Sequence, residues 1–440
     1  MQQAHEKTLG FWSCWALAVG TMIGSGILLV PASLAPFGLL SIVAWLISSV
    51  GAISIILCFA RLSSRTMRDG GPYVYVQEAF GDLAGFVMAW LYWIGFWISI
   101  PIVAIAFVSY LGIFLPVLQQ NNVLQGLAAL AVIGVFTLIN VRGLKEMSFA
   151  QVVLTVLKIV PLVLVMGAGI VFGSPHNLPA FNPSHAPLLQ SLTAATLITL
   201  WPFTGFEAAV SSAKSVRDPE RTIPRALTAA VLLVTVIYLS ASVSVLFLLT
   251  PEQLAHSEAP FADAARVLGA WGAPFIAFGA LIVTAGTLNG VIFASGQMPM
   301  AVAEDGKAPS WLARLNKGGA PYLALLLSSA LGAAMLVLNY SRGLVDAYTF
   351  LLKMATATSL IYYFFCGLAE FRHSWRAAKG WAAVALFSCA FSAFAIIGSG
   401  VGTTGTDWTV PLWGGALTLA GVPFYFLFRP RKTTALTPAS

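Results

Sequence analysis

Long apolar stretches of about 20 residues recur along the chain and are separated by short polar segments. A stretch of this length is enough for one helix to cross a bilayer. We therefore predict twelve membrane helices, with the third and eighth long enough to tilt. They lie at about 11–33, 38–60, 84–115, 123–141, 149–173, 190–213, 226–250, 272–303, 319–339, 345–369, 381–402 and 409–428. Because the connections are short, we expect residues 1–440 to form a single transmembrane domain.

The composition agrees with an integral membrane protein. Hydrophobic residues make up 58% of the chain and charged residues only 9%, whereas a soluble domain has about 25% charged residues. The net charge is +7, and 19 of the 23 lysines and arginines fall in alternate connections and in the two tails. This bias predicts that both termini lie in the cytoplasm, at the cell inner membrane. The basic charge therefore indicates topology, and we expect no nucleic-acid partner.

The residues suited to enzyme chemistry are badly placed for it. The four cysteines lie inside predicted spans without metal-ligand spacing, and all five histidines lie in loops or tails. Small buried cysteines are usually packing residues. We therefore expect neither an enzyme nor a bound cofactor or metal.

Two of the predicted spans are interrupted. Gly20-Thr21-Met22-Ile23-Gly24-Ser25-Gly26-Ile27 puts three glycines in the first span, and Trp201-Pro202-Phe203-Thr204-Gly205-Phe206-Glu207 puts a proline and a glycine in the sixth. Glycine and proline both weaken a helix, and a bilayer tolerates irregular backbone only where it is buried or lines a cavity. Breaks at corresponding positions of two halves indicate a transporter binding site. The two breaks lie five spans apart, which predicts an inverted repeat of about 11–173 and about 190–369, followed by two additional helices at about 381–428.

Two polar connections complete a recognisable pattern. Gly70-Gly71-Pro72-Tyr73 follows the second span, and Asp218-Pro219-Glu220-Arg221 with Pro224 follows the sixth. Together with the two breaks, these motifs resemble the amino acid–polyamine–organocation superfamily over essentially the whole chain. The resemblance implies an all-α, leucine-transporter-like fold and transport by alternating access, with the substrate at the two breaks. It also makes a homodimer one expectation.

The first break offers unpaired backbone N–H groups at Gly24, Ser25 and Gly26, which suit a carboxylate. The resemblance implies that this segment binds the substrate's α-carboxylate, while carbonyls near Trp201, Phe203 and Thr204 take the α-ammonium. Thr21, Ile23 and Gly205 complete the expected substrate site. The alternative interpretation of the first break is a glycine-rich face for helix packing. Trp201 is expected to cover the substrate as a gate, or else to be an anchoring aromatic.

Three charged residues inside predicted spans are candidates for coupling or gating. Glu207 is costly at that depth and is either a proton carrier or a protonated, hydrogen-bonded bridge between helices. Lys158 lies in the middle of the fifth span, and the resemblance implies that its ammonium occupies the place of a sodium ion, which predicts sodium independence. Lys353 lies in the outer third of the tenth span. It either reaches the outer surface or faces the pocket.

Departures from the basic amino acid antiporters change the expected substrate. Those relatives have asparagine where this chain has Thr21, and a tryptophan where this chain has Val291. Losing that tryptophan removes a cation–π partner, and Lys158 and Lys353 add positive charge. We therefore expect a sodium-independent exchanger or proton-coupled permease for small or medium neutral amino acids. The alternatives are a basic amino acid or polyamine antiporter and an acidic amino acid transporter. A channel or a membrane sensor that does not transport is the competing class.

Overall fold

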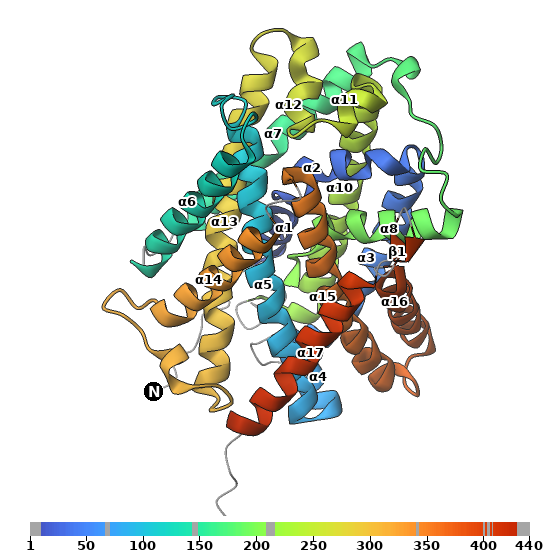
Figure 1. Ribbon diagram of the computed structural model, residues 1–440. Coiled ribbons are helices and arrows are strands. Elements are labelled where there is room, and N and C mark those ends of the chain that lie inside the picture. The colour runs from blue at the N-terminus through green and yellow to red at the C-terminus, as the bar shows by residue number, and fades with distance from the viewer. Residues whose placement is uncertain are drawn as a thin grey trace, which may run out of the picture.

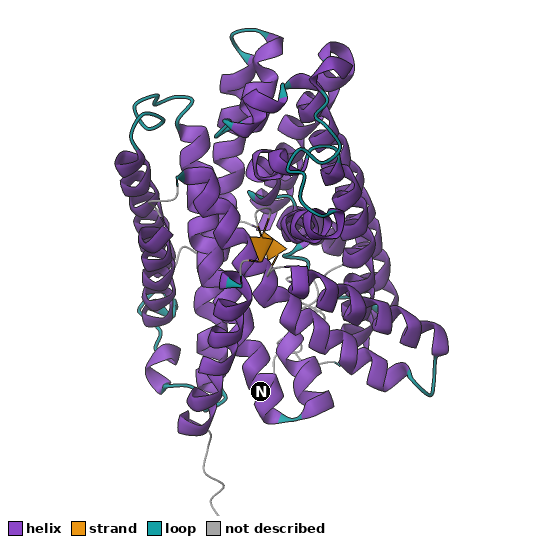
Figure 2. Ribbon diagram, turned by 45° about the vertical axis from the view of Figure 1, so that its right-hand side comes forward, coloured by secondary structure: helices purple, strands orange, loops and turns teal. Residues whose placement is uncertain are grey.

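The computed structural model of the protein describes residues 10–66, 71–142, 148–207, 216–339, 343–398, 401–402, 405–406 and 408–428. In the first half these form α1 (Phe11–Met22), α2 (Gly26–Leu34), η1 (Ala35–Phe37), α3 (Leu40–Arg65), α4 (Pro72–Phe80), α5 (Asp82–Leu111), α6 (Asn122–Val141), α7 (Ser148–Phe172) and η2 (Pro175–Asn177). In the second half they form α8 (Leu188–Leu200), η3 (Trp201–Phe203), α10 (Pro219–Leu248), α11 (Pro251–Ala255), α12 (Pro260–Ala264), η5 (Ala265–Leu268), α13 (Gly272–Glu304), η6 (Ser310–Ala313), α14 (Tyr322–Asn339), α15 (Leu344–Ser374), α16 (Lys379–Gly398) and α17 (Thr409–Phe428). The strands of the described part are the antiparallel pair β1 (Val401–Gly402) and β2 (Gly405–Thr406), visible in Figure 2.

The helices follow the predicted spans closely. Within the described residues, nine helices are long and apolar enough to cross a membrane, and the bent pair α1 and α2, with η1, makes a tenth. Two shorter apolar helices, Lys158–Phe172 and Leu188–Phe203, occupy the fifth and sixth predicted spans. A helix in every predicted span agrees with the membrane fold, while the number of twelve crossings stays a prediction.

The helices pack in two groups around a shared centre (Figure 1). In one group α3 packs against α8 and α10, and α1 packs against α10. In the other, α5 packs against α6, α13 and α14. Helix α7 contacts α1, α10 and α13, and α15 contacts α3, α5 and α8, so each of these two helices touches both groups. This pairing is the one that a five-plus-five repeat would produce, although the repeat itself stays a prediction.

Burial separates an interior from an apolar outer face. Large side chains such as Trp45 and Tyr348 are almost fully enclosed. Apolar side chains on the outer helices are instead exposed, including Leu138 on α6 and Leu412 and Leu419 on α17. An exposed apolar belt around helices whose backbone is internally hydrogen-bonded is the surface that a bilayer requires.

The short helices at the two ends of the bundle were not anticipated from the sequence. Residues from Pro72 onward form α4, where a proline can occupy the first helical position after Gly71, whose φ is +59°. At the opposite end of Figure 1, α11 and α12 lie in the connection that precedes α13. The span expected at 381–402 was too long, because α16 ends at Gly398 and β1 begins at Val401. Residues 67–70 and 208–215, which contain parts of the two polar connections, lie outside the described residues.

Candidate functional site

The first predicted break is a real interruption of the helix. Helix α1 ends at Met22, Ile23 is extended, and α2 begins at Gly26 with its axis turned by 43°. The interruption leaves carbonyl groups of α1 without their usual helical partners. Lys158 Nζ donates a hydrogen bond to Gly20 O at 2.9 Å, and the Tyr238 hydroxyl donates one to Met22 O at 2.6 Å. Side chains from α7 and α10 thus satisfy the backbone that the break exposes.

The second predicted break follows α8. Residues Trp201–Phe203 form one 3-10 turn, Thr204 is extended, and Gly205 has a φ of +102°, which favours glycine. The two breaks touch through their backbones. A Cβ atom on Gly205 would lie 3.1 Å from Thr21 O, and one on Gly26 would lie 3.1 Å from Pro202 Cα. Glycine at these positions lets the breaks approach each other without intervening side chains.

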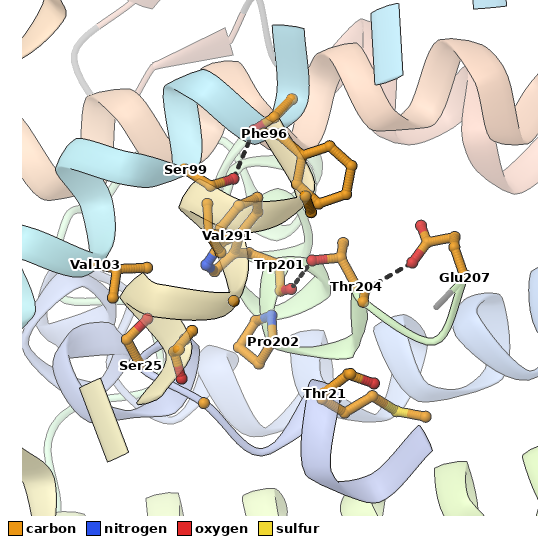
Figure 3. A pocket seen from close by; sticks show the side chains of 18 of the residues that line it. Thr21, Ser25, Phe96, Ser99, Val103, Trp201, Pro202, Thr204, Glu207 and Val291 are labelled. Carbon is orange, nitrogen blue, oxygen red and sulfur yellow. Dashed lines mark hydrogen bonds between the residues drawn. The ribbon is translucent and has the colours of Figure 1, made fainter. Parts of the chain in front are cut away.

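A cavity of about 260 Å³ lies between the breaks and the neighbouring helices. In Figure 3, Ser25 and Glu207 lie at opposite ends of this space, with Trp201 and Thr204 between them. The Ser25 side chain does not cap the N-terminus of α2. The Leu28 N–H group donates to Ser25 O at 3.2 Å, whereas the N–H groups of Gly26 and Ile27 come before the first helical acceptor and are suited to a ligand. The cavity therefore has a backbone donor end and a carboxyl end.

The carboxyl end is highly organised. Glu207 is 2% exposed, and its Oε2 accepts a hydrogen bond of 2.8 Å from the Gly205 N–H group. Its Oε1 accepts hydrogen bonds from the hydroxyl groups of Tyr362, at 3.0 Å, and Tyr363. These neutral donors hold the carboxyl group in one position at the edge of the cavity.

Ten of the thirteen residues singled out from the sequence line this cavity. They are Thr21, Gly24, Ser25, Gly26, Lys158, Trp201, Thr204, Gly205, Glu207 and Val291. Two of their hydroxyl groups are engaged locally, since Thr21 Oγ1 donates to Leu17 O and Ala18 O and Thr204 Oγ1 donates to Trp201 O.

The other three predicted residues do not line the cavity. Ile23 and Phe203 are each 1% exposed and belong to the packed core, where the Phe203 ring meets the rings of Trp45 and Tyr238. Both side chains are apolar, and they are buried among other core side chains rather than at the cavity wall. Lys353 is half-buried on α15 and is not among the lining residues. Of the two alternatives for Lys353, reaching the outer surface was the slightly favoured one, and its role stays a prediction.

Residues from α5, α13 and α15 complete the cavity and were missed from the sequence. They include Tyr92, Phe96, Ser99, Val103, Thr287, Ser359 and Tyr362. Each belongs to a regular helix with no break, so only the way that helix is rotated brings the side chain to the cavity. The adjacent pair Tyr362 and Tyr363, in the middle of an apolar span, was the one available signal. The described residues contain no group of three or more His, Cys, Asp or Glu side chains that could hold a metal ion.

A comparison of the sequence with known families identifies the type of protein. The amino acid permease family matches residues 9–426. This chain belongs to the amino acid permease family. Members of that family are transporters, so the permease is classed with transport proteins rather than with enzymes.

Several characterised relatives resemble the permease over most of its length. It is 31% identical over 342 residues to the cadaverine/lysine antiporter of Escherichia coli, covering 76% of each chain. It is 30% identical over 386 residues to the arginine/ornithine antiporter of Pseudomonas aeruginosa, covering 83% of this chain and 78% of that protein. It is 27% identical over 365 residues to the putrescine transporter of Escherichia coli, covering 82% and 83%. The names of these relatives agree with the alternative predicted from the sequence, a basic amino acid or polyamine antiporter. They agree less well with the main prediction, a transporter of neutral amino acids.

Proposed function

We propose that this permease is a sodium-independent antiporter of cationic amino acids and related diamines. The observation that carries the proposal is a cavity with uncapped helix N–H groups at Ser25 and a carboxyl group at Glu207 at the other end. A substrate with a carboxylate at one end and an ammonium group at the other has the matching charges. The names of the relatives support the same substrate class.

The lining of the cavity removes one objection to a cationic substrate. The resemblance predicts that Val291 stands where the basic amino acid antiporters have a tryptophan, but Tyr92, Phe96, Trp201 and Tyr362 also line the cavity. Aromatic faces attract ammonium and guanidinium groups, most strongly where water is excluded. The order of our expectations therefore changes, and cationic substrates now come before neutral ones.

We further propose that Lys158 takes the place of a coupling cation. Its ammonium group donates a hydrogen bond to Gly20 O, a carbonyl oxygen freed by the first break. A bound metal ion at this position could use the same oxygen as a ligand. A cationic side chain supplied by the protein at this position would make a bound cation from solution unnecessary. Glu207 is the proposed proton-coupling group, because it is the one carboxyl side chain among the lining residues of this described cavity.

The proposed transporter crosses the inner membrane twelve times, with both termini in the cytoplasm and two inverted repeats of five spans. Alternating access would then move the first and sixth spans relative to α5 and α13. The two backbone contacts between the breaks, at Gly26 and Gly205, would make these segments move together. Partners beyond the substrate, protons and the bilayer are not required by this mechanism, although a homodimer is compatible with it.

The test is exchange in proteoliposomes loaded with unlabelled substrate and free of sodium. Radiolabelled lysine, arginine, ornithine and leucine are supplied outside, and cadaverine, putrescine or the same amino acids are placed inside. We expect saturable uptake of a cationic amino acid only when the vesicles contain a cationic counter-substrate. Exchange that appears only when sodium is added in a parallel assay, or no exchange of any of these compounds in either assay, would refute the proposal.

Neutral amino acids remain the second candidate because Lys158 and Val291 both line the cavity. The lysine adds positive charge near the substrate, and the valine provides an apolar surface of moderate size. The same assay separates the two candidates. Leucine uptake that excess lysine and ornithine fail to inhibit would favour the neutral exchanger.

A further inference from the structure

Two buried tyrosines contact the half-helix α2 from neighbouring helices. The Tyr348 hydroxyl, on α15, donates a hydrogen bond of 2.9 Å to Gly26 O. The Tyr110 hydroxyl, on α5, donates one of 2.9 Å to Leu28 O. Both side chains are 0% exposed, so each hydroxyl has been taken out of water to make its contact.

These hydrogen bonds are not needed to satisfy the α2 backbone. In a helix, the carbonyls of Gly26 and Leu28 already accept from the N–H groups four residues later, at Val30 and Ala32. The tyrosines therefore add a second donor to carbonyls that have one. A second bond to the same oxygen restrains the direction of that peptide group and polarises it further.

The restrained peptide group is the one that matters for a ligand. Gly26 O belongs to the same peptide as the N–H group of Ile27, and that N–H group is among the first of α2, which have no helical partner. Gly24, Ser25 and Gly26 line the cavity at this end. Holding Gly26 O from outside the cavity thus fixes the direction of an N–H group at the donor end.

We propose that Tyr348 is a positioning residue for substrate carboxylate binding, with Tyr110 supporting it two residues further along α2. The proposal rests on the proposed function, in which the start of α2 receives a carboxylate. Tyr348 does not line the cavity, so it acts through the Gly26 peptide and not by touching the substrate.

Tyr110 also joins α2 to the outer connection. Its hydroxyl oxygen accepts a hydrogen bond of 3.4 Å from the N–H group of Phe261, in α12, and Phe261 is 1% exposed. One hydroxyl therefore connects α2, α5 and α12, and α12 also packs directly on α2. This connection ties α2, which begins at the donor end of the cavity, to the segment that precedes α13.

The test compares two ligands that differ by a carboxylate. Lysine and cadaverine share the same carbon chain and terminal ammonium group, and cadaverine lacks the carboxylate. Binding of both is measured for the full-length protein in detergent by competition against a radiolabelled substrate. We expect Tyr348→Phe to weaken lysine binding by about three- to tenfold, the range of one neutral hydrogen bond, and to change cadaverine binding by less than about twofold.

Two further variants make the comparison specific. Tyr110→Phe is expected to produce the same selective loss for lysine. Tyr425→Phe removes a hydroxyl from a half-buried tyrosine on α17 that does not line the cavity, and it should leave both affinities unchanged. Equal weakening of lysine and cadaverine by Tyr348→Phe, or unchanged lysine binding, would overturn the positioning role.

The outcome for wild-type protein separates this proposal from the proposed function. If wild-type protein binds neither lysine nor cadaverine, the proposed substrate class is wrong. The same comparison is then made with an amino acid that does bind and with its carboxamide. A selective loss for the carboxylate form in Tyr348→Phe would still support the positioning role, and an equal loss for both would refute it.

Discussion

The contact between the two helix breaks can be tested with one added methyl group. Gly205 has a φ of +102°, and a Cβ atom there would lie 3.1 Å from Thr21 O and 3.4 Å from Thr21 C. Gly205→Ala therefore combines a backbone conformation that alanine rarely adopts with a tight contact to main-chain atoms. Since both neighbours are backbone, neither can rotate away as a flexible side chain would.

The expected cost follows from the conformation. Holding a non-glycine residue in a sparsely populated backbone region costs roughly 1–3 kcal/mol, and each 1.4 kcal/mol corresponds to about a tenfold change in an equilibrium constant. Because Gly205 lines the cavity, we expect strain to lower substrate affinity by about 5- to 150-fold and to lower the melting temperature as well.

The assay is saturation binding together with thermal unfolding of purified protein. Gly134→Ala is the matched control, since Gly134 lies within α6 and a Cβ atom there meets no atom within 4 Å. That substitution should leave binding unchanged and leave stability unchanged or slightly higher, because alanine favours a helix. Wild-type affinity and an unchanged melting temperature in Gly205→Ala would refute the proposed contact between the breaks.

Three other substitutions test separate parts of the structure. Lys158→Ala leaves the Gly20 carbonyl without its lysine donor, so transport should fall while membrane insertion is retained; full activity would count against the cation role. Glu207→Gln should flatten the pH dependence of exchange, and an unaltered pH profile would reject proton coupling through Glu207. Burial, followed by the charge of Asp263, raises the pKa of Glu258 above its ordinary range, while a hydrogen bond from Gln125 opposes the shift. Glu258 therefore contributes stability at acidic pH that is lost as pH rises through its folded-state pKa. Glu258→Gln should reduce the fall in melting temperature between pH 5 and pH 8, and an identical fall would contradict this.

The sequence predicted the membrane spans well because a bilayer imposes a length and a composition that can be counted along one dimension. Helices α13 and α17 match the predicted spans to within a residue. Both breaks were also predictable, since glycine and proline act on the local backbone wherever they occur. The short helices α4, α11 and α12 were not, because each begins at a proline in a polar connection that also resembles an ordinary loop.

Charged residues show how far such prediction reaches. Glu207 and Lys158 were recognised because a charge inside an apolar span is costly and needs a partner. The partners themselves, Tyr362 for Glu207 and the Gly20 carbonyl for Lys158, come from helices far away in the sequence. Lys353 met the same criterion, yet it does not line the cavity.

The sequence by itself determined which stretches are long and apolar enough to cross a membrane, which two of them are interrupted, and which carry a charged residue inside. Only the tertiary structure decided that Phe96 and Tyr92 face the cavity and that Tyr348 holds the Gly26 carbonyl. The physical reason is that an apolar span has no polar face to orient it. The rotation of such a helix depends on packing with its neighbours, and that packing determines which side chains meet the substrate.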